Sequence, residues 1–442
     1  MNRYPLFSKT LMIGLLALLL LIPLSMIESK ISERKALQYG VQEDIARSAA
    51  KPQTLSGPYL VLRYKLRERK IEKDENGHEK TSIVESAPCE TVLAPHTLKI
   101  AGDAEVESRS RGIYKAQLYN LRSTISGSFV VPRAYGLSSP VEDIIPEAAY
   151  LVMRVSDSRG IRNAPLLTLD GVTHEFSPGG IAPVAGNGMH VSLATPGIDQ
   201  PHTLKFSFPL DLLGTTSLAV QPSGNTTEVA LKSAWPHPSF GGSFLPRTRA
   251  VSAQGFSAQW LVSSLARNAA TQADNNQANE AETFSVAFID PVNIYLMSER
   301  AVKYGLMFVL LVFTSFFMFE VLRGLRVHPM QYLLVGLAMA MFFLLIISLS
   351  EHMPFVAAYI ASGSACVLLI GFYLAGVLQN RRPALAFSGA IALLYAVLFG
   401  VLQSEDNALL MGSLILFAAL AAVMTLTRRM DWYRLNETSN TV

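Results

Sequence analysis

Serine is the first residue type to test, because an activated serine carries out acyl transfer in many hydrolases. Ser32 and Lys35 have the S-x-x-K spacing, in which a lysine can activate the hydroxyl. The S-D-N and K-T-G segments that complete such a site do not occur in the sequence, and neither does a G-x-S-x-G elbow. We interpret the Ser32 spacing as coincidental and predict no catalytic residues.

Histidine and acidic residues are the next candidates, because together they bind zinc and similar metals. His78-Glu79 and His174-Glu175 are adjacent pairs, but neither has the second histidine four residues away that a zincin helix requires. The sequence also lacks a Walker loop and a dinucleotide-binding glycine loop. We predict neither a metal site nor a cofactor, and expect surface or capping roles for the histidines.

The stretch Trp235–Phe240 places two prolines around one histidine between two aromatic residues. Prolines fix the backbone φ angle, so the stretch is stiff. One interpretation is a rigid recognition edge, and the other is a corner that ends a strand and packs its aromatic side chains inward. We favour the corner, and retain Trp235, His237 and Phe240, together with Arg159, as candidate interaction residues.

Three titratable residues lie within or beside long apolar runs, where ionisable groups are costly and often functional. Glu320 lies near the end of its run, three residues before Arg323. That depth favours an ion pair with Arg323, or snorkelling to the interface, over a proton or ion site. Glu351 and His352 lie between two runs and are candidates for titration or for contact with a neighbouring domain.

The elements that position these residues follow from hydropathy. Hydrophobic residues make up 50% of the 442-residue chain and charged residues 16%. Apolar runs of about 18 residues or more, the length that crosses a hydrocarbon core, occur only at the two ends. The sequence predicts six transmembrane helices, over residues 10–27, 305–322, 332–349, 355–378, 384–402 and 408–426. The first is interpreted as an uncleaved anchor, because no small-x-small cleavage pattern follows it.

Arginine and lysine mark the cytoplasmic side of a membrane protein. They occur in the N-terminal tail, in the connections after the second and fourth helices, and in the C-terminal tail, whereas residues 350–354 and 403–407 contain none. Both termini are therefore predicted to be cytoplasmic. The expected organisation is a cytoplasmic tail (1–9), a first helix (10–27), an outer domain with a juxtamembrane helix (28–303), a five-helix bundle (304–426) and a cytoplasmic tail (427–442).

The outer domain is neutral, because residues 28–303 hold 28 Lys plus Arg against 28 Asp plus Glu. This balance does not support a nucleic-acid partner. Cys89 and Cys366 lie in different parts of the chain and are not expected to form a disulfide. In the fourth helix, small residues allow close packing, which fits a compact bundle or a homo-oligomer interface equally well. These residues are Ala361, Gly363, Ala365, Gly371 and Ala375.

Short stretches rich in β-branched and aromatic residues alternate with turn residues through the outer domain. Leu204, Phe206 and Phe208 fall on one face of such a stretch. This pattern is typical of one β-sandwich or of two linked sandwiches, so the fold class is an α+β membrane protein with an inserted sandwich-like domain. Strands are expected over residues 59–66, 113–119, 124–131, 150–155, 204–208, 218–220, 229–235, 256–262 and 284–289. We also expect a helix over 31–50, a hairpin turn at 76–77 and a loop over 268–282.

Several segments spread nearly end to end resemble the family of the bacterial inner-membrane protein CreD. They are Ser156-Asp157-Ser158-Arg159-Gly160-Ile161, the stretch Trp235–Pro246, the stretch His328–Leu337, Ser350-Glu351-His352 and the stretch Thr427–Tyr433. The resemblance implies a Gram-negative envelope protein, produced under a two-component system and connected with envelope stress and the β-lactam response. It supplies no catalytic or ligand-binding residues.

The leading hypothesis is a non-enzymatic inner-membrane protein that supports cell-envelope integrity. Its outer domain would bind periplasmic or peptidoglycan-associated proteins, while the helices anchor it in the lipid bilayer. An alternative is an ion-coupled transporter or channel built on the C-terminal helices, suggested by Glu320, Glu351 and His352. A less favoured alternative is an envelope hydrolase whose site brings His190 or His237 together with distant carboxylates.

Overall fold

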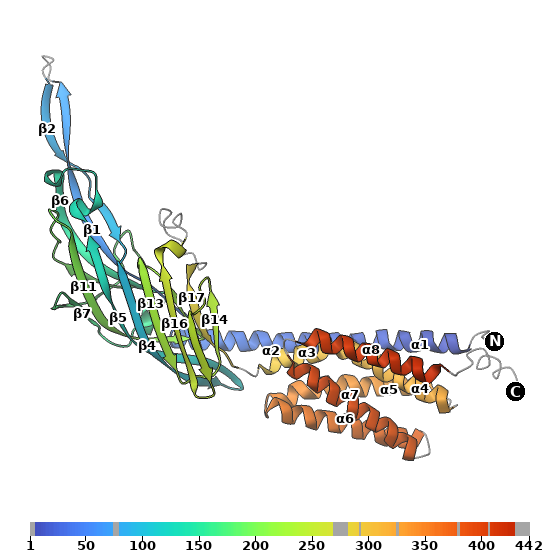
Figure 1. Cartoon of the computed structure of the whole chain (residues 1–442). Helices are drawn as coiled ribbons and strands as arrows, with labels where there is room; N and C mark the ends of the chain where they lie inside the picture. Colours follow the sequence, from blue (N-terminus) through green and yellow to red (C-terminus); the bar gives the residue numbers. More distant parts are fainter. Residues whose placement is uncertain are drawn as a thin grey trace, which may run out of the picture. The chain divides into compact units, whose positions relative to one another are not determined.

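The chain forms two compact units in a computed structural model (Figure 1). One unit combines Met1–Tyr39 with Val292–Val442 and is helical, and the other, Gly40–Pro291, is mainly β-structure. The structure describes residues 5–73, 79–267, 282–290, 293–323, 327–377, 381–404 and 407–428.

The helical unit is built from the two ends of the sequence. Its helices are α1 (Pro5–Leu19), the first part of α2 (Leu21–Ser48), α3 (Ile294–Lys303), α4 (Gly305–Arg323), α5 (Pro329–Ser350), α6 (Phe355–Val377), α7 (Arg381–Gln403) and α8 (Ala408–Thr427). Each of the five C-terminal runs expected to be helical coincides with one of the helices α4 to α8, apart from Leu378, the last residue of the fourth run, which lies outside the described residues. An uninterrupted apolar run therefore locates a helix to within a few residues.

Five helices of the described residues are long and apolar enough to cross a membrane. The first is the segment Ser8–Ser48, which covers most of α1 and all of α2, and the other four lie in α5 to α8. Helices α3 and α4 meet at a bend of 45° and are long and apolar enough only when they are taken together. Five of the six expected spans thus correspond to such helices, and the sixth, over residues 305–322, falls in the bent pair.

Local sequence sets where the spanning helix α5 begins. His328 is its N-cap, and its ring nitrogen Nδ1 accepts a hydrogen bond from the Met330 N–H. Gln331 returns a bond, because its side-chain oxygen accepts the His328 N–H at 3.1 Å. Pro329 occupies the first helical position, where the missing N–H costs nothing. This capping box fixes the start of the stretch His328–Leu337.

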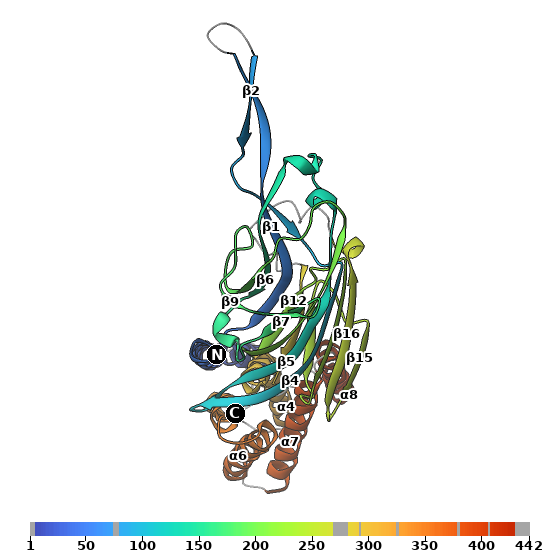
Figure 2. The ribbon, with the colours of Figure 1, turned by 90° about the vertical axis from the view of Figure 1, so that its left-hand side faces the viewer.

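The β unit is a sandwich of two sheets, which Figure 2 shows edge on. One sheet has the order β14-β17-β12-β1-β6-β10-β9, with β2 and β3 also paired to β1; the other has the order β15-β16-β13-β4-β5-β11-β7-β8. The first sheet contains β1 (Gln53–Lys73), β2 (Glu79–Glu85), β3 (Cys89–Leu93), β6 (Ile144–Val155), β9 (Ser177–Pro178), β10 (Gly188–Leu193), β12 (Ser217–Gln221), β14 (Pro238–Gly242) and β17 (Phe284–Phe288). The second contains β4 (Thr97–Arg111), β5 (Tyr114–Val131), β7 (Leu166–Leu169), β8 (Val172–Glu175), β11 (His202–Thr215), β13 (Thr226–Ser233), β15 (Thr248–Ser252) and β16 (Gly255–Ser263).

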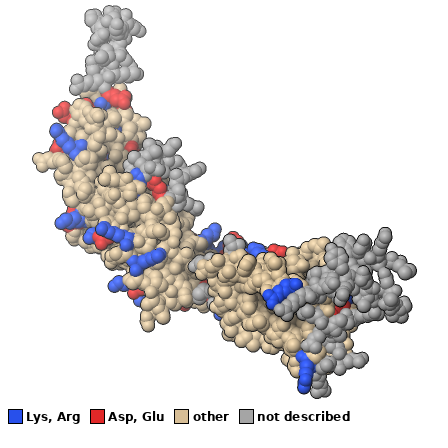
Figure 3. Space-filling view, turned by 45° about the vertical axis from the view of Figure 1, so that its right-hand side comes forward, with Lys and Arg blue, Asp and Glu red and all other residues tan. Residues whose placement is uncertain are grey.

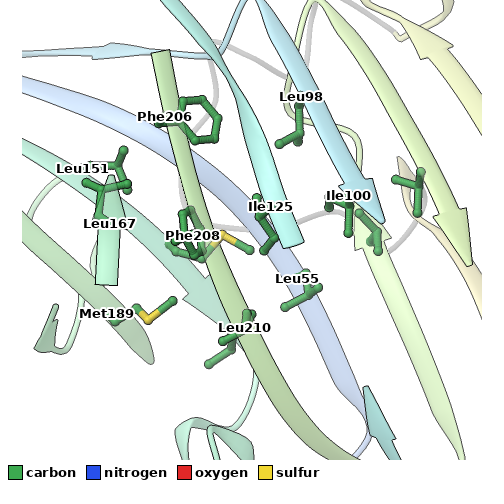
Figure 4. Packing of buried hydrophobic residues seen from close by; sticks show 14 of the residues in the cluster. Leu55, Leu98, Ile100, Ile125, Leu151, Leu167, Met189, Phe206, Phe208 and Leu210 are labelled. Atoms are coloured by element: carbon green, nitrogen blue, oxygen red, sulfur yellow. The ribbon is translucent and has the colours of Figure 1, made fainter. Parts of the chain in front are cut away.

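A single hydrophobic core lies between the two sheets. Strand β11 alternates along its length, so that Phe206, Phe208 and Leu210 all point inward (Figure 4). They belong to one continuous cluster with Leu55 of β1 and Ile125 of β5. Because one cluster includes residues of both sheets, the domain is one sandwich and not two linked ones.

Three expectations about the strands and the helix differ in detail from the structure. Residues 114–119 and 124–131 belong to one long strand, β5, which pairs with both β4 and β11, and Ile113 lies in the turn before it. Strand β4 was not expected, although Leu98, Ile100 and Ala104 alternate inward along it. The helix expected over 31–50 is part of α2, which continues from the anchor without a break at residue 31. The expected turn at 76–77 and most of the loop over 268–282 lie outside the described residues.

Candidate functional sites

The stretch Trp235–Phe240 forms the corner between β13 and β14. The indole Nε1 of Trp235 donates a hydrogen bond to the Ile289 carbonyl at 3.0 Å. Phe240 packs edge-on against Phe256 and Trp260, with ring centroids 5.6 and 5.8 Å apart. Both aromatic side chains therefore contribute to closing one edge of the sandwich.

His237 differs from its aromatic neighbours because it is exposed to solvent. Its carbonyl oxygen accepts the Ile289 N–H, and its ring lies edge-on to Trp235 with centroids 6.4 Å apart. Strand β14, which begins at Pro238, is the terminal strand of its sheet in the described chain. The corner thus holds His237 outward on a backbone that two prolines and the aromatic packing stiffen.

Arg159 lies in a network that fixes the end of α2 to the β domain. Its guanidinium donates to both carboxylate oxygens of Asp157, at 3.0 and 2.7 Å, and to the Arg47 carbonyl at 2.6 Å. Asp157 also accepts the backbone N–H of Lys51 at 3.1 Å. The Arg159 guanidinium, bonded to a largely buried carboxylate, lowers the pKa of Asp157 to about 2.

The rest of the segment Ser156–Ile161 serves the same junction. Ser156 Oγ donates to the Pro52 carbonyl, and Ser158 Oγ accepts the Gly188 N–H at 3.0 Å. A methyl group at Gly160 would overlap the side chain of Gln53 and the Leu213 carbonyl, so only glycine fits there. Half of the Arg159 side chain stays exposed. The contacts of its guanidinium give the segment Ser156–Ile161 a structural role at the junction between α2 and the β domain.

Glu320 is buried in the helical unit, and all its described partners lie in α1, α5 or the residues just before α5. One carboxylate oxygen pairs with Lys9 Nζ and accepts the Val327 N–H at 2.9 Å. The other accepts the Tyr332 hydroxyl at 2.8 Å. The partner that the structure describes is thus Lys9, 311 positions away, whereas the sequence pointed to Arg323, whose side chain lies outside the described residues.

Glu351 belongs to a second polar cluster in the helical unit. Its carboxylate accepts the Tyr295 hydroxyl at 3.2 Å and lies 3.6 Å from the Arg34 guanidinium. One turn after Tyr295 in α3, Glu299 accepts from Lys35, which follows Arg34 in α2, at 3.1 Å, and from Lys303 at 2.8 Å. His352 is exposed and is not joined to this cluster by a described side-chain contact. Of the three candidate titrating residues, two are therefore held in ion pairs.

The described residues offer little to a metal ion or a buried ligand. No group of three or more His, Cys, Asp and Glu side chains among them is arranged to hold a metal. His190 hydrogen bonds through Nδ1 to the Gly179 carbonyl, and His237 lies at the domain edge. A small cavity of about 20 Å³ inside the sandwich is lined almost wholly by apolar side chains. On the face shown in Figure 3, basic and acidic side chains are interspersed over the β domain.

Sequence reasoning did not find the Asp157 junction or the Lys9–Glu320 pair. The only available signals were the unusual segment Ser156–Ile161 and a carboxylate inside an apolar run, and neither names a partner.

These observations define a multi-pass membrane protein with a large β-sandwich inserted after its first spanning helix. The chain belongs to the family of the inner membrane protein CreD, whose family model matches residues 5–433. The inner membrane protein CreD of Escherichia coli (strain K12) is 37% identical over 436 residues, which cover 98% of this chain and 95% of that protein. The protein is therefore a multi-pass inner membrane protein.

Similarity to solved structures is weak. An M1 zinc metallopeptidase from Deinococcus radiodurans aligns over 44% of this chain and 42% of its own, with 9% sequence identity and a TM-score of 0.21. A score this low carries no argument about fold or chemistry.

Proposed function

We propose that this protein supports the integrity of the cell envelope by non-catalytic contacts of its β domain with periplasmic or peptidoglycan-associated proteins. The observation that carries the proposal is the exposed, stiffened edge at His237 on a domain with a closed apolar core. Such a domain suits recognition at its surface, because its described residues form no metal cluster and the cavity inside the sandwich is lined almost wholly by apolar side chains. The helices hold it at the membrane, and the proposal includes a role under envelope or β-lactam stress.

The proposed topology has both termini in the cytoplasm and the β domain in the periplasm. Arginines and lysines in the two tails and in the connections after the second and fourth expected helices support it, because such residues are retained on the cytoplasmic side. A cysteine introduced for Ser239, an exposed residue of β14, should react with a membrane-impermeant maleimide in cells whose outer membrane is permeabilised. Labelling only after the inner membrane is broken would contradict this orientation.

Site-specific photo-crosslinking in intact cells tests the recognition edge. A photoreactive residue in place of His237 should capture one or a few envelope proteins, identified by mass spectrometry. The matched control replaces Glu228, which is also exposed but lies on the outer face of the other sheet, where it pairs with Lys99. Capture at position 237 well above that at position 228 supports the proposal, and equal background at both positions contradicts it.

The non-catalytic part of the proposal has its own test. The full-length protein, purified in mild detergent, should leave peptidoglycan fragments and β-lactams unchanged over hours. Turnover that scales with protein concentration and survives re-purification would establish an enzyme and refute this part.

A further inference from the structure

The N-terminal spanning helix packs closely against the C-terminal helices of its own unit. Helix α1 contacts both α4 and α5, and Leu20, at the junction of α1 and α2, is buried. A methyl group at Gly336 of α5 would overlap the Leu20 side chain, so the glycine forms a notch for that leucine. At Gly305 the corresponding methyl position lies 3.2 Å from Leu24, which makes a second close approach. Small residues at such contacts let helix backbones approach each other in a membrane.

The Lys9–Glu320 pair lies at one end of this contact. Glu320 retains 5% of its side-chain exposure and Lys9 23%. Lys9 Nζ also donates to the Val327 carbonyl at 3.1 Å, while Tyr332 donates to the carboxylate. A buried carboxylate in an apolar bundle is tolerated when a cation and further donors surround it, and Glu320 has a cation and two neutral donors. We call Lys9, Glu320, Val327 and Tyr332 the latch.

The second polar cluster, around Glu351 and Glu299, contacts the N-terminal spanning helix beyond its apolar run. Arg34 pairs with Glu351, and Lys35 pairs with Glu299. Lys9 and Arg34 are 25 residues apart, which spans about 38 Å along an α-helix. That length slightly exceeds a hydrocarbon core of about 30 Å, so the two clusters fit the two polar boundaries of a bilayer.

We propose that Glu320 and the stretch His328–Leu337 form an intramolecular docking site for the N-terminal spanning helix. The capping box of α5 positions Tyr332, Tyr332 and the Val327 N–H orient the Glu320 carboxylate, and the carboxylate binds Lys9. One helical turn beyond Tyr332, Gly336 receives Leu20. The first helix is therefore a fixed member of the bundle and not a separate anchor, and Glu320 is a positioning residue and not an ion-coupling group.

Neutralising the two partners of the latch separately and together tests this proposal in the full-length protein. Lys9→Met keeps an unbranched stem but leaves Glu320 with no cation, so the Tm in mild detergent should fall by about 5–10 °C. Glu320→Gln should cost less, because the Lys9 ammonium still reaches the surface. The double variant K9M/E320Q should return to within about 3 °C of wild type, because it buries no charge.

The control variant changes a lysine of the same helical span that lies outside the latch. Lys30→Met removes a cation from the same helical span, but Lys30 forms only an exposed pair with Glu33, so the Tm should change by less than about 2 °C. The latch is refuted if Lys9→Met behaves like Lys30→Met, or if the double variant is no more stable than K9M. A double variant that regains its Tm but does not support envelope integrity in cells as the wild-type protein does would show that the Glu320 charge has a role beyond docking. That result would overturn the assignment of Glu320 as a positioning residue.

The notch provides an independent test that does not involve charge. Gly336→Ala should lower the Tm because the new methyl group overlaps Leu20, and Leu20→Ala should lower it by removing a buried side chain. If the two residues fit each other as proposed, the double variant loses clearly less than the sum of the two single losses. Strictly additive losses would place Leu20 outside the notch and refute the docking site even if a latch variant fails to accumulate.

Discussion

Asp157 is the residue of the β domain whose ionisation should be most visible in stability. Its carboxylate accepts four hydrogen bonds, two from the Arg159 guanidinium and one each from the backbone N–H groups of Arg159 and Lys51. The Arg159 guanidinium holds the pKa of Asp157 at about 2, against a value of about 3.9 in an unfolded chain. Since one pKa unit corresponds to about 1.4 kcal/mol, the difference amounts to about 2.6 kcal/mol, which solvent screening at the half-exposed Arg159 side chain reduces to about 2 kcal/mol.

The sign of the pH dependence follows from the lowered pKa. The contribution is fully present above about pH 4, where the unfolded chain is also ionised, and it is lost as the pH falls from about 4 towards 2. Asp157→Asn removes the charge but keeps one acceptor oxygen. The variant should therefore be less stable than wild type by about 2 kcal/mol at pH 7, and the difference should shrink steadily below pH 4.

Denaturant unfolding of the full-length protein at several pH values measures this difference, with the fluorescence of Trp235 and Trp260 reporting on the β domain. Glu228→Gln is the control, because the Lys99–Glu228 pair is more than half exposed and its loss should change stability by less than about 1 kcal/mol at any pH. A stability difference for Asp157→Asn that is the same at pH 7 and pH 3 would refute the reasoning, because it would show that charge is not the cause.

Three further variants, two of them with a matched control, test the packing of the sandwich and its edge. Gly127→Ala should abolish folding or lower the Tm by about 10 °C, because the methyl group overlaps the Thr97 carbonyl and Phe206, whereas Gly40→Ala, with open space around it, should be neutral or slightly stabilising by helix propensity. Tyr119→Phe should cost about 1 kcal/mol in denaturant unfolding, because it removes the hydroxyl that donates to the Ser217 carbonyl at 2.9 Å. Phe240→Ala should cost about 2 kcal/mol, because it opens the aromatic edge, while His237→Ala should leave stability within about 0.5 kcal/mol and reduce partner capture only. Equal thermal losses for F240A and H237A would contradict the assigned division between packing and recognition.

The sequence predicts the spanning helices well because their signal is local. A run such as residues 332–349 contains no charged residue, and a helix that long has few alternatives in a membrane. Strands are harder, because β4 carries charged residues along its exposed face and contains Gly102, so that only alternate positions record its burial. The merging of two expected strands into β5 has a similar cause: residues 120–123 look like a break in sequence, but pairing with β4 and β11 on both sides keeps them extended.

The candidate site residues show what a linear sequence does not contain. Glu320 and Arg323 are close in sequence, so a short-range pair was the natural prediction, yet the described cation comes from the other end of the chain. Arg159 looked like a free recognition group, and its guanidinium instead bonds to Asp157 and to the end of α2. In both cases the partner is chosen by tertiary packing, which brings a buried carboxylate to the nearest available cation and has no fixed sequence spacing.

The two units of this molecule differ in whether their candidate residues are available to bind a ligand or a partner. In the helical unit, the buried carboxylate Glu320 already has a cation and two hydrogen-bond donors, so an ion would have to displace Lys9 to bind there. Displacement would cost the docking of the first helix, which makes a freely exchanging ion site at Glu320 energetically unfavourable. His237, in contrast, is exposed on a backbone already stiffened by prolines and packed aromatic rings, so a partner that binds there pays little ordering entropy. Selection of a partner is therefore expected at the β domain, and the latch is expected to keep the membrane unit intact while that contact is made.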